Sequence, residues 1–117
     1  MNLIKPEVLM RAVDNNTEVF LHLLGVFLRI CPEMLDRLEQ SIAAGNQASI
    51  CQQAHSLKGC LLLIGAEPTS EKLNLMERAA RNNEANCDPA TFSSLRLEFD
   101  QVIAEVKVCL SENKPAD

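Results

Sequence analysis

The residues best suited to chemistry in this chain are His55, Lys58 and Gly59. On an α-helix, residues three and four positions apart share a face, so Lys58 and Gly59 would lie one turn from His55. A neutral imidazole nitrogen is a good nucleophile toward phosphorus, and the phosphoramidate that it forms can pass the phosphoryl group on again. Lys58 can pair with phosphoryl oxygens through charge-assisted hydrogen bonds. The three residues are therefore suited to phosphoryl transfer.

A helix that positions these residues is predicted from about Gln47 to Gly65. Its buried stripe repeats at three- and four-residue steps and consists of Ile50, Ala54, Leu57, Leu61 and Ile64. His55 lies roughly opposite this stripe and is expected to be exposed. Gly65 is a helix C-terminus signal, because glycine readily adopts the left-handed conformation that commonly ends helices.

The surface around His55 is predicted to receive a second protein. Gly59 disfavours a helix by about 1 kcal/mol relative to Ala, but bare backbone there would let a partner's active site come close to His55. Gln52 flanks the same spot, and Leu62 lies two turns after His55 on the same face. We expect Gln52, Gly59 and Leu62 to contact the partner. Leu63 is also expected outside the core, which would make this surface apolar.

The composition restricts the class of protein. The chain has 117 residues, 47% of them hydrophobic, which is enough for one core and one domain over residues 1–117. A net charge of −5 argues against nucleic acid or an anionic membrane as a partner. Five cysteines without CxxC spacing indicate reduced thiols. No apolar run approaches the roughly 20 residues that span a bilayer, and the N-terminus does not resemble a signal peptide, so we expect a cytoplasmic protein.

The rest of the chain is predicted to be helical. A short helix is expected over residues 3–14, with Pro6 in its first turn. A long helix, capped by Asn16 or Thr17, runs to about Ala44, and Pro32 bends it without ending it. Gly45 suits a left-handed cap. The last two helices are expected near Ser70–Asn82, capped by Thr69 or Ser70, and near Ala90–Leu110, opened by Asp88 or Pro89.

These helices predict an all-α fold, an antiparallel up-down four-helix bundle with a short additional N-terminal helix. The long helix carries an unbroken three- and four-residue apolar repeat from Leu21 to Ile42. The last helix carries a stripe of Phe92, Leu95, Phe99, Val102, Val106 and Cys109. The bundle core is expected over about residues 17–110, followed by a polar tail, 111–117.

The motif His-Ser-Leu-Lys-Gly, followed by Gly65-Ala66, resembles the signature of histidine-containing phosphotransfer (HPt) domains, and the similarity extends over about Thr17 to Leu110. The resemblance implies that His55 is the phosphoacceptor, that Lys58 stabilises the phosphoryl group and that Gly59 keeps the docking face open. It also implies a monomeric carrier, not an enzyme in its own right. The partners would be receiver domains of a hybrid histidine kinase and of a response regulator, whose aspartyl phosphates donate and accept the group. The carrier would need no cofactor, because the receiver brings the Mg²⁺.

Two other functions are compatible with the same residues. Cys51 and His55 have the i,i+4 spacing of two metal ligands on one helix face, and His22 could supply a third ligand from a neighbouring helix. Lys58 would repel a cation at such a site. Alternatively, the chain is a helical adaptor in which the histidine has no chemical role.

Overall fold

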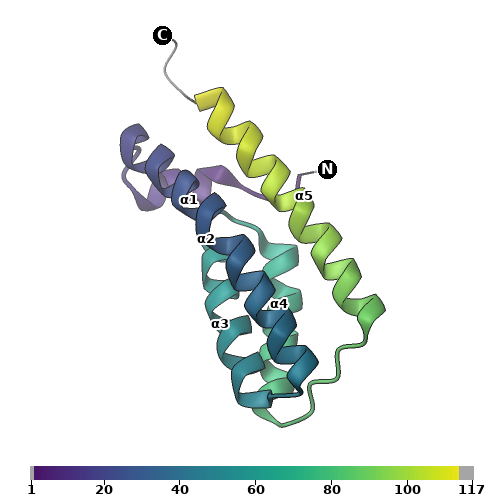
Figure 1. Cartoon of the computed structure of the whole chain (residues 1–117). Helices are drawn as coiled ribbons and strands as arrows, with labels where there is room; N and C mark the ends of the chain where they lie inside the picture. Colours follow the sequence, from purple (N-terminus) through teal and green to yellow (C-terminus); the bar gives the residue numbers. More distant parts are fainter. Residues whose placement is uncertain (1, 114–117) are drawn as a thin grey trace.

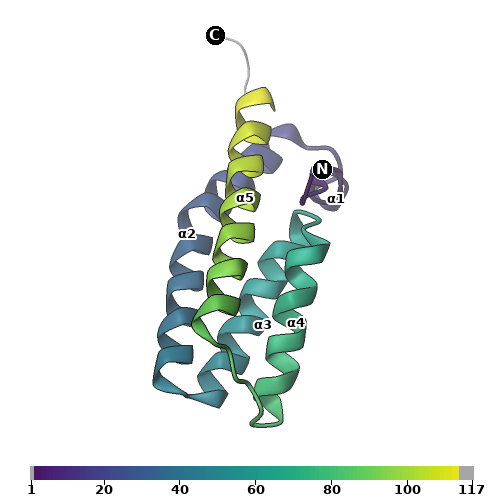
Figure 2. The same ribbon diagram turned by 90° about the vertical axis from the view of Figure 1, so that its right-hand side faces the viewer.

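A computed structural model describes residues 2–113, which form five helices. They are α1 (Pro6–Ala12), α2 (Thr17–Ala44), α3 (Gln47–Leu63), α4 (Glu67–Arg81) and α5 (Pro89–Asn113). Helices α2 to α5 run up and down beside one another, and α1 lies across one end (Figures 1 and 2). The predicted four-helix bundle with an additional N-terminal helix is therefore confirmed.

The apolar stripes predicted from the sequence form the core. All five stripe residues predicted for the motif helix are buried, four in α3 and Ile64 directly after it, and so are all six of α5. In α2 the buried row is centred on Phe20, Leu24, Phe27, Cys31, Leu35 and Leu38, while Leu21, Leu28 and Ile42 flank it and are partly buried. Helices α3 and α4 pack along most of their length, whereas α5 packs mainly against α2.

The ends of α2 and the start of α3 follow local sequence signals. The side chain of Asn16 accepts a hydrogen bond from the Val19 backbone N–H, which caps α2 as predicted. Helix α2 continues through Pro32 and ends at Gly45, whose φ of 66° is left-handed. Asn46 then caps α3 by accepting from the Ser49 N–H. Two residues thus suffice to reverse the chain.

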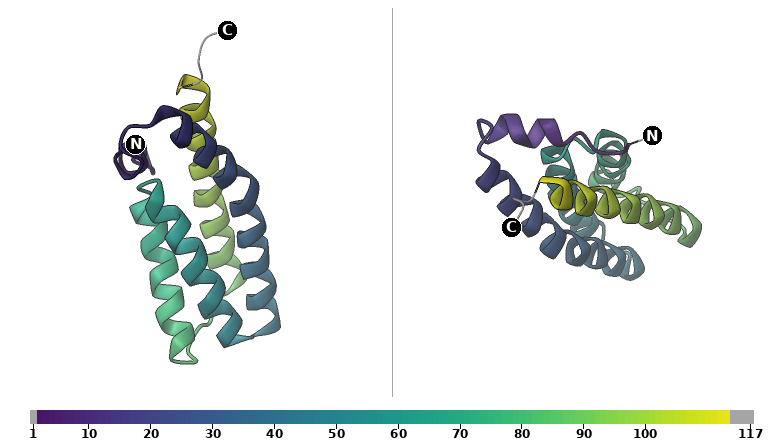
Figure 3. Two further views of the ribbon diagram at one scale, coloured as in Figure 1. Left: turned by 90° about the vertical axis from the view of Figure 1, so that its left-hand side faces the viewer. Right: turned by 90° about the horizontal axis from the view of Figure 1, so that it is seen from above.

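The N-terminal segment closes the end of the bundle that holds the α3–α4 turn (Figure 3). The Lys5 N–H donates to the Ile64 carbonyl at 2.9 Å, and the Leu3 and Ile4 N–H groups donate to the Glu105 carboxylate of α5. Helix α1 is shorter than the predicted 3–14, because residues 2–5 make these contacts before Pro6 starts the helix, and a turn at residues 13–15 follows Ala12.

Two boundaries predicted from the sequence are wrong. Helix α4 begins at Glu67 instead of Ser70, and neither Thr69 nor Ser70 caps it, because Pro68 is accommodated in the first turn instead of breaking the helix. Helix α5 continues to Asn113, so residues 111–113 do not belong to a tail. The rest of the predicted tail, 114–117, lies outside the described residues. Asp88 opens α5 as predicted, accepting a hydrogen bond from the Thr91 N–H at 2.7 Å.

Candidate functional site

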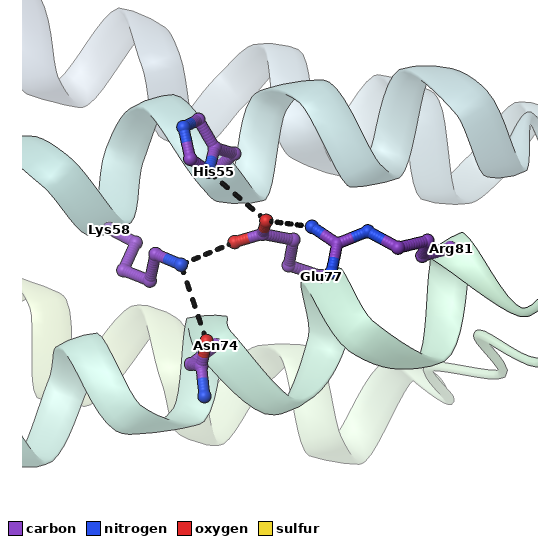
Figure 4. A network of polar contacts seen from close by, with 5 residues as sticks. All are labelled: His55, Lys58, Asn74, Glu77 and Arg81. Carbon is purple, nitrogen blue, oxygen red and sulfur yellow. Dashed lines mark hydrogen bonds and ion pairs between the residues drawn. The ribbon is translucent and has the colours of Figure 1, made fainter.

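The His55 side chain is 68% exposed on the outer face of α3, as its position opposite the buried stripe predicts. Its Nδ1 lies 3.0 Å from Oε2 of Glu77, a residue of α4 whose side chain is only 3% exposed (Figure 4). The buried carboxylate therefore contacts Nδ1 from the protein interior, while most of the imidazole is exposed to solvent.

Glu77 is the centre of a network that links α3 to α4. Lys58 Nζ lies 2.6 Å from Glu77 Oε1 and donates to Asn74 Oδ1 at 3.2 Å. The Lys58 ammonium and Glu77 Oε1 form an ion pair, but the geometry of this contact is not that of a hydrogen bond. Arg81, one turn along α4, donates to Oε2 at 2.6 Å, so this oxygen serves both Arg81 and His55 (Figure 4). The cation predicted beside His55 is thus already paired in the free protein.

The charge of Glu77 follows from these neighbours. Burial acts to raise the pKa of Glu77, but Lys58 and His55 act in the opposite direction through close contact and charge, and the pKa lies below its ordinary value. The carboxyl is therefore ionised at neutral pH. A buried carboxylate without partners would be strongly unfavourable, so the cations and the ring are what keep it in place.

An ionised carboxylate fixes the tautomer of a neutral His55 ring. Because Glu77 Oε2 can only accept, Nδ1 carries the proton and donates it, and Nε2 keeps its lone pair. Nε2 lies on the side of the ring away from Glu77. The arrangement therefore presents one defined nucleophilic nitrogen to solvent.

The residues predicted to contact a partner lie on the exposed face of α3. Gln52 and Gly59 are exposed, and Leu62 and Leu63 are 47% and 54% exposed although the neighbouring Leu61 and Ile64 are buried. A Cβ added at Gly59 would meet no atom within 4 Å. We call Gln52, His55, Gly59 and Leu62 the open face.

Sequence reasoning missed Glu77, Asn74 and Arg81. A signal for Glu77 was present: it continues the three- and four-residue repeat that begins at Leu73 and ends at Ala80, and so lies in the buried row of α4. A carboxylate at such a position needs partners. Arg81 is four residues after Glu77 on α4, so helical spacing alone places the two together. Asn74 is identified as a partner of Lys58 only once the packing of α3 on α4 is known.

The residues considered above as metal ligands, Cys51, His55 and His22, do not form a cluster that could hold a cation in the described part of the chain. His22 is exposed on α2 and Cys51 is partly buried on α3. Over residues 2–113, no group of three or more His, Cys, Asp or Glu side chains is arranged to hold a metal ion. No helix in this described range is long and apolar enough to cross a membrane.

Comparisons with known proteins agree with this geometry. The family model described as the Hpt domain matches residues 22–105. The structure is similar to histidine-containing phosphotransfer protein B (HptB) from Pseudomonas aeruginosa PAO1, with a TM-score of 0.83 and 25% identity over 93% of this chain and 95% of that chain. It also shares its fold with the HPT domain of the Hpt sensor hybrid histidine kinase from Shewanella, with a TM-score of 0.77 and 20% identity over 94% and 95%. No curated protein sequence matches the chain.

Proposed function

Because the chain belongs to the Hpt domain family, we propose that His55 is the residue that carries the phosphoryl group in a phosphorelay. The family works as a phosphotransfer carrier and not as a kinase. Here His55 accepts the group from an aspartyl phosphate of one receiver domain and passes it to another, and the reaction runs in either direction. The observation that carries this assignment is the exposed ring whose Nδ1 is held by the buried carboxylate of Glu77.

The transfer step uses Nε2. Its lone pair attacks phosphorus, the bond between phosphorus and the aspartate oxygen breaks, and the aspartate leaves as a carboxylate. The Nδ1 proton stays in the hydrogen bond to Glu77, where the negative charge stabilises the more positive ring of the transition state. Glu77 is therefore a positioning residue: it acts through the ring and does not touch the phosphoryl group.

Lys58 is proposed to stabilise the phosphoryl group. In the free protein its side chain is only 20% exposed, and its ammonium pairs with Glu77 and Asn74. Because a lysine side chain has four rotatable carbons and three donor hydrogens, it can turn one donor toward a phosphoryl oxygen and keep another on Glu77. Its loss should slow transfer without abolishing it, because the nucleophile remains.

The partners proposed are the receiver domains of a hybrid histidine kinase and of a response regulator, which bring the Mg²⁺ that their aspartates need. The carrier itself is proposed to need no cofactor and to work as a monomer without nucleic acid or membrane insertion. Gln52, Gly59 and Leu62 would contact the receiver, since they surround His55 on the open face.

The test is transfer of labelled phosphate from a phosphorylated receiver domain. His55→Gln should accept no label, whereas the control His22→Gln should accept it at the wild-type rate. Lys58→Ala should be slower by about 10- to 100-fold, which corresponds to one charge-assisted hydrogen bond. Label retained by His55→Gln would overturn the assignment, and an unchanged rate in Lys58→Ala would show that this lysine serves only the fold.

A further inference from the structure

Arg81 borders the transfer site but has no part in the proposed transfer step. Its Nη2 donates to Glu77 Oε2 at 2.6 Å, and the same oxygen lies 3.0 Å from Nδ1 of His55 (Figure 4). The guanidinium and the imidazole are therefore at most two hydrogen-bond lengths apart. An ion pair between residues four apart on one helix, with Arg81 63% exposed, contributes little to stability. What the guanidinium does change is the electrostatic potential at the ring.

Glu77 is one carboxylate between two cations. Lys58 lies against Oε1 and Arg81 against Oε2, each at 2.6 Å. Because Glu77 is ionised, these three side chains together carry one net positive charge. A carboxylate alone beside an imidazole favours the protonated imidazolium, whereas a net positive group opposes it. An imidazolium has no free lone pair on Nε2, so it cannot attack phosphorus.

We propose, building on the proposed phosphotransfer role of His55, that Arg81 keeps the imidazole neutral at neutral pH by offsetting the charge of the Glu77 oxygen that contacts it. Glu77 then fixes the tautomer of the ring without converting it into an imidazolium. Lys58 acts in the same direction from the other carboxylate oxygen, but it is also proposed to contact the phosphoryl group. Arg81 acts only through Glu77, which makes it a positioning residue.

The other titratable side chains near the ring do not share this contact. Cys51 lies one turn before His55 on α3, and Arg78 follows Glu77 directly on α4. Within residues 2–113, neither pairs with Glu77 or with the ring, and no hydrogen bond or ion pair joins the ring to α2. Arg78 is exposed, so it is a matched control: the same side chain on the same helix, without the contact to the carboxylate.

The first measurement is an NMR titration of the His55 ring in the full chain, with the exposed His22 as an internal reference. In Arg81→Gln the midpoint of the His55 titration should rise by about 0.5 pH unit or more, as expected from removing one charge at this distance. Arg81→Lys keeps the charge and should titrate like the wild type, as should Arg78→Gln. The midpoint of His22 should not change in any variant.

The second measurement is the rate of transfer from a phosphorylated receiver domain, taken at each pH as a ratio to the wild type so that the receiver's own pH dependence cancels. Arg81→Gln should be slower by about threefold or more below the midpoint, which corresponds to that shift. It should match or exceed the wild type near about pH 9, where the ring is neutral in both proteins.

An unchanged His55 titration in Arg81→Gln would overturn the proposal, and so would an equal shift in Arg78→Gln, which would indicate a general effect of surface charge. A loss of rate by the same factor at every pH would also overturn it, because Arg81 would then act by contacting the phosphoryl group or the receiver. None of these results affects the phosphoacceptor assignment, which depends on the labelling of His55→Gln.

Discussion

Gly59 and Gly65 lie six residues apart on the same stretch of chain, yet a methyl group would meet opposite surroundings at the two positions. At Gly65 the backbone is left-handed, with φ of 67°, and an added Cβ would lie 2.6 Å from the Lys5 Cβ and 2.7 Å from the Lys5 carbonyl oxygen. At Gly59 the backbone is helical, and an added Cβ would meet no atom within 4 Å.

The difference separates a glycine that serves the fold from one that does not. Gly65 ends the motif helix and admits the N-terminal segment, whose Lys5 N–H donates to the adjacent Ile64 carbonyl. Nothing within the described chain explains Gly59, which lowers helix stability by about 1 kcal/mol relative to Ala. We propose that its small size serves a partner that approaches His55.

The largest effect is expected from a charge on the buried side of α3, and the matched variant places the same charge on the exposed side. Leu57 is fully buried and Leu62 is 47% exposed. Leu57→Asp should lower the free energy of unfolding by on the order of 4 kcal/mol or more, because it buries an unpaired charge. Leu62→Asp should change it by less than about 0.5 kcal/mol, as for other surface positions. Thermal melts of the two variants compare them, and a Leu62→Asp variant that unfolds would contradict the orientation of α3.

The two glycines should respond to alanine with opposite signs. Gly65→Ala should lower the free energy of unfolding by about 1–3 kcal/mol, since it forces a left-handed residue into contact with Lys5. Gly59→Ala should raise it by up to about 1 kcal/mol. Urea unfolding measures both. A Gly59→Ala variant with a lower free energy of unfolding would contradict the conclusion that Gly59 does not serve the fold.

Binding should reveal what Gly59 is for. Gly59→Leu should keep the helicity of the wild type but weaken binding to a receiver domain by roughly tenfold or more, because the side chain holds the partner away from His55. A titration with the cognate receiver measures the dissociation constant, with Ala104→Leu at an exposed position of α5, outside the open face, as the control. Equal binding by wild type and Gly59→Leu would leave this glycine without an explanation.

A smaller effect is expected in acid. The pKa of Glu77 is lower in the folded chain than its ordinary value of 4.5 in the unfolded chain. Its contribution to stability is therefore present above pH 4.5 and is lost as the pH falls through the lower, folded value. Melts between pH 7 and pH 3 should show a weaker acid dependence for Glu77→Gln than for the wild type. Identical dependence would mean that the carboxylate is not held by Lys58 and His55.

Much of the fold could be predicted because each helix carries its own signal. The buried rows of α3 and α5 follow from apolar spacing alone, and Asn16 and Gly45 mark the ends of α2 by local hydrogen bonding and backbone freedom. The start of α4 was misplaced because Pro68 can either precede a helix or lie in its first turn, and the sequence does not distinguish the two.

The site could be predicted only on the α3 side. His55, Lys58 and Gly59 share one helix, so helical spacing places them together. Glu77 is 22 positions from His55, and it meets the ring only because the three-residue α3–α4 turn sets which residues of the two helices lie opposite. That pairing depends on packing between helices, which periodicity within one helix does not encode.

The central claim is that Glu77 holds Nδ1 of His55 and leaves Nε2 to react. The most direct test is NMR of the phosphorylated chain with ¹⁵N-labelled histidine, which identifies the phosphorylated nitrogen. We predict a phosphoryl group on Nε2 of His55, with Nδ1 still protonated. A phosphoryl group on Nδ1, or on any residue other than His55, would contradict the account.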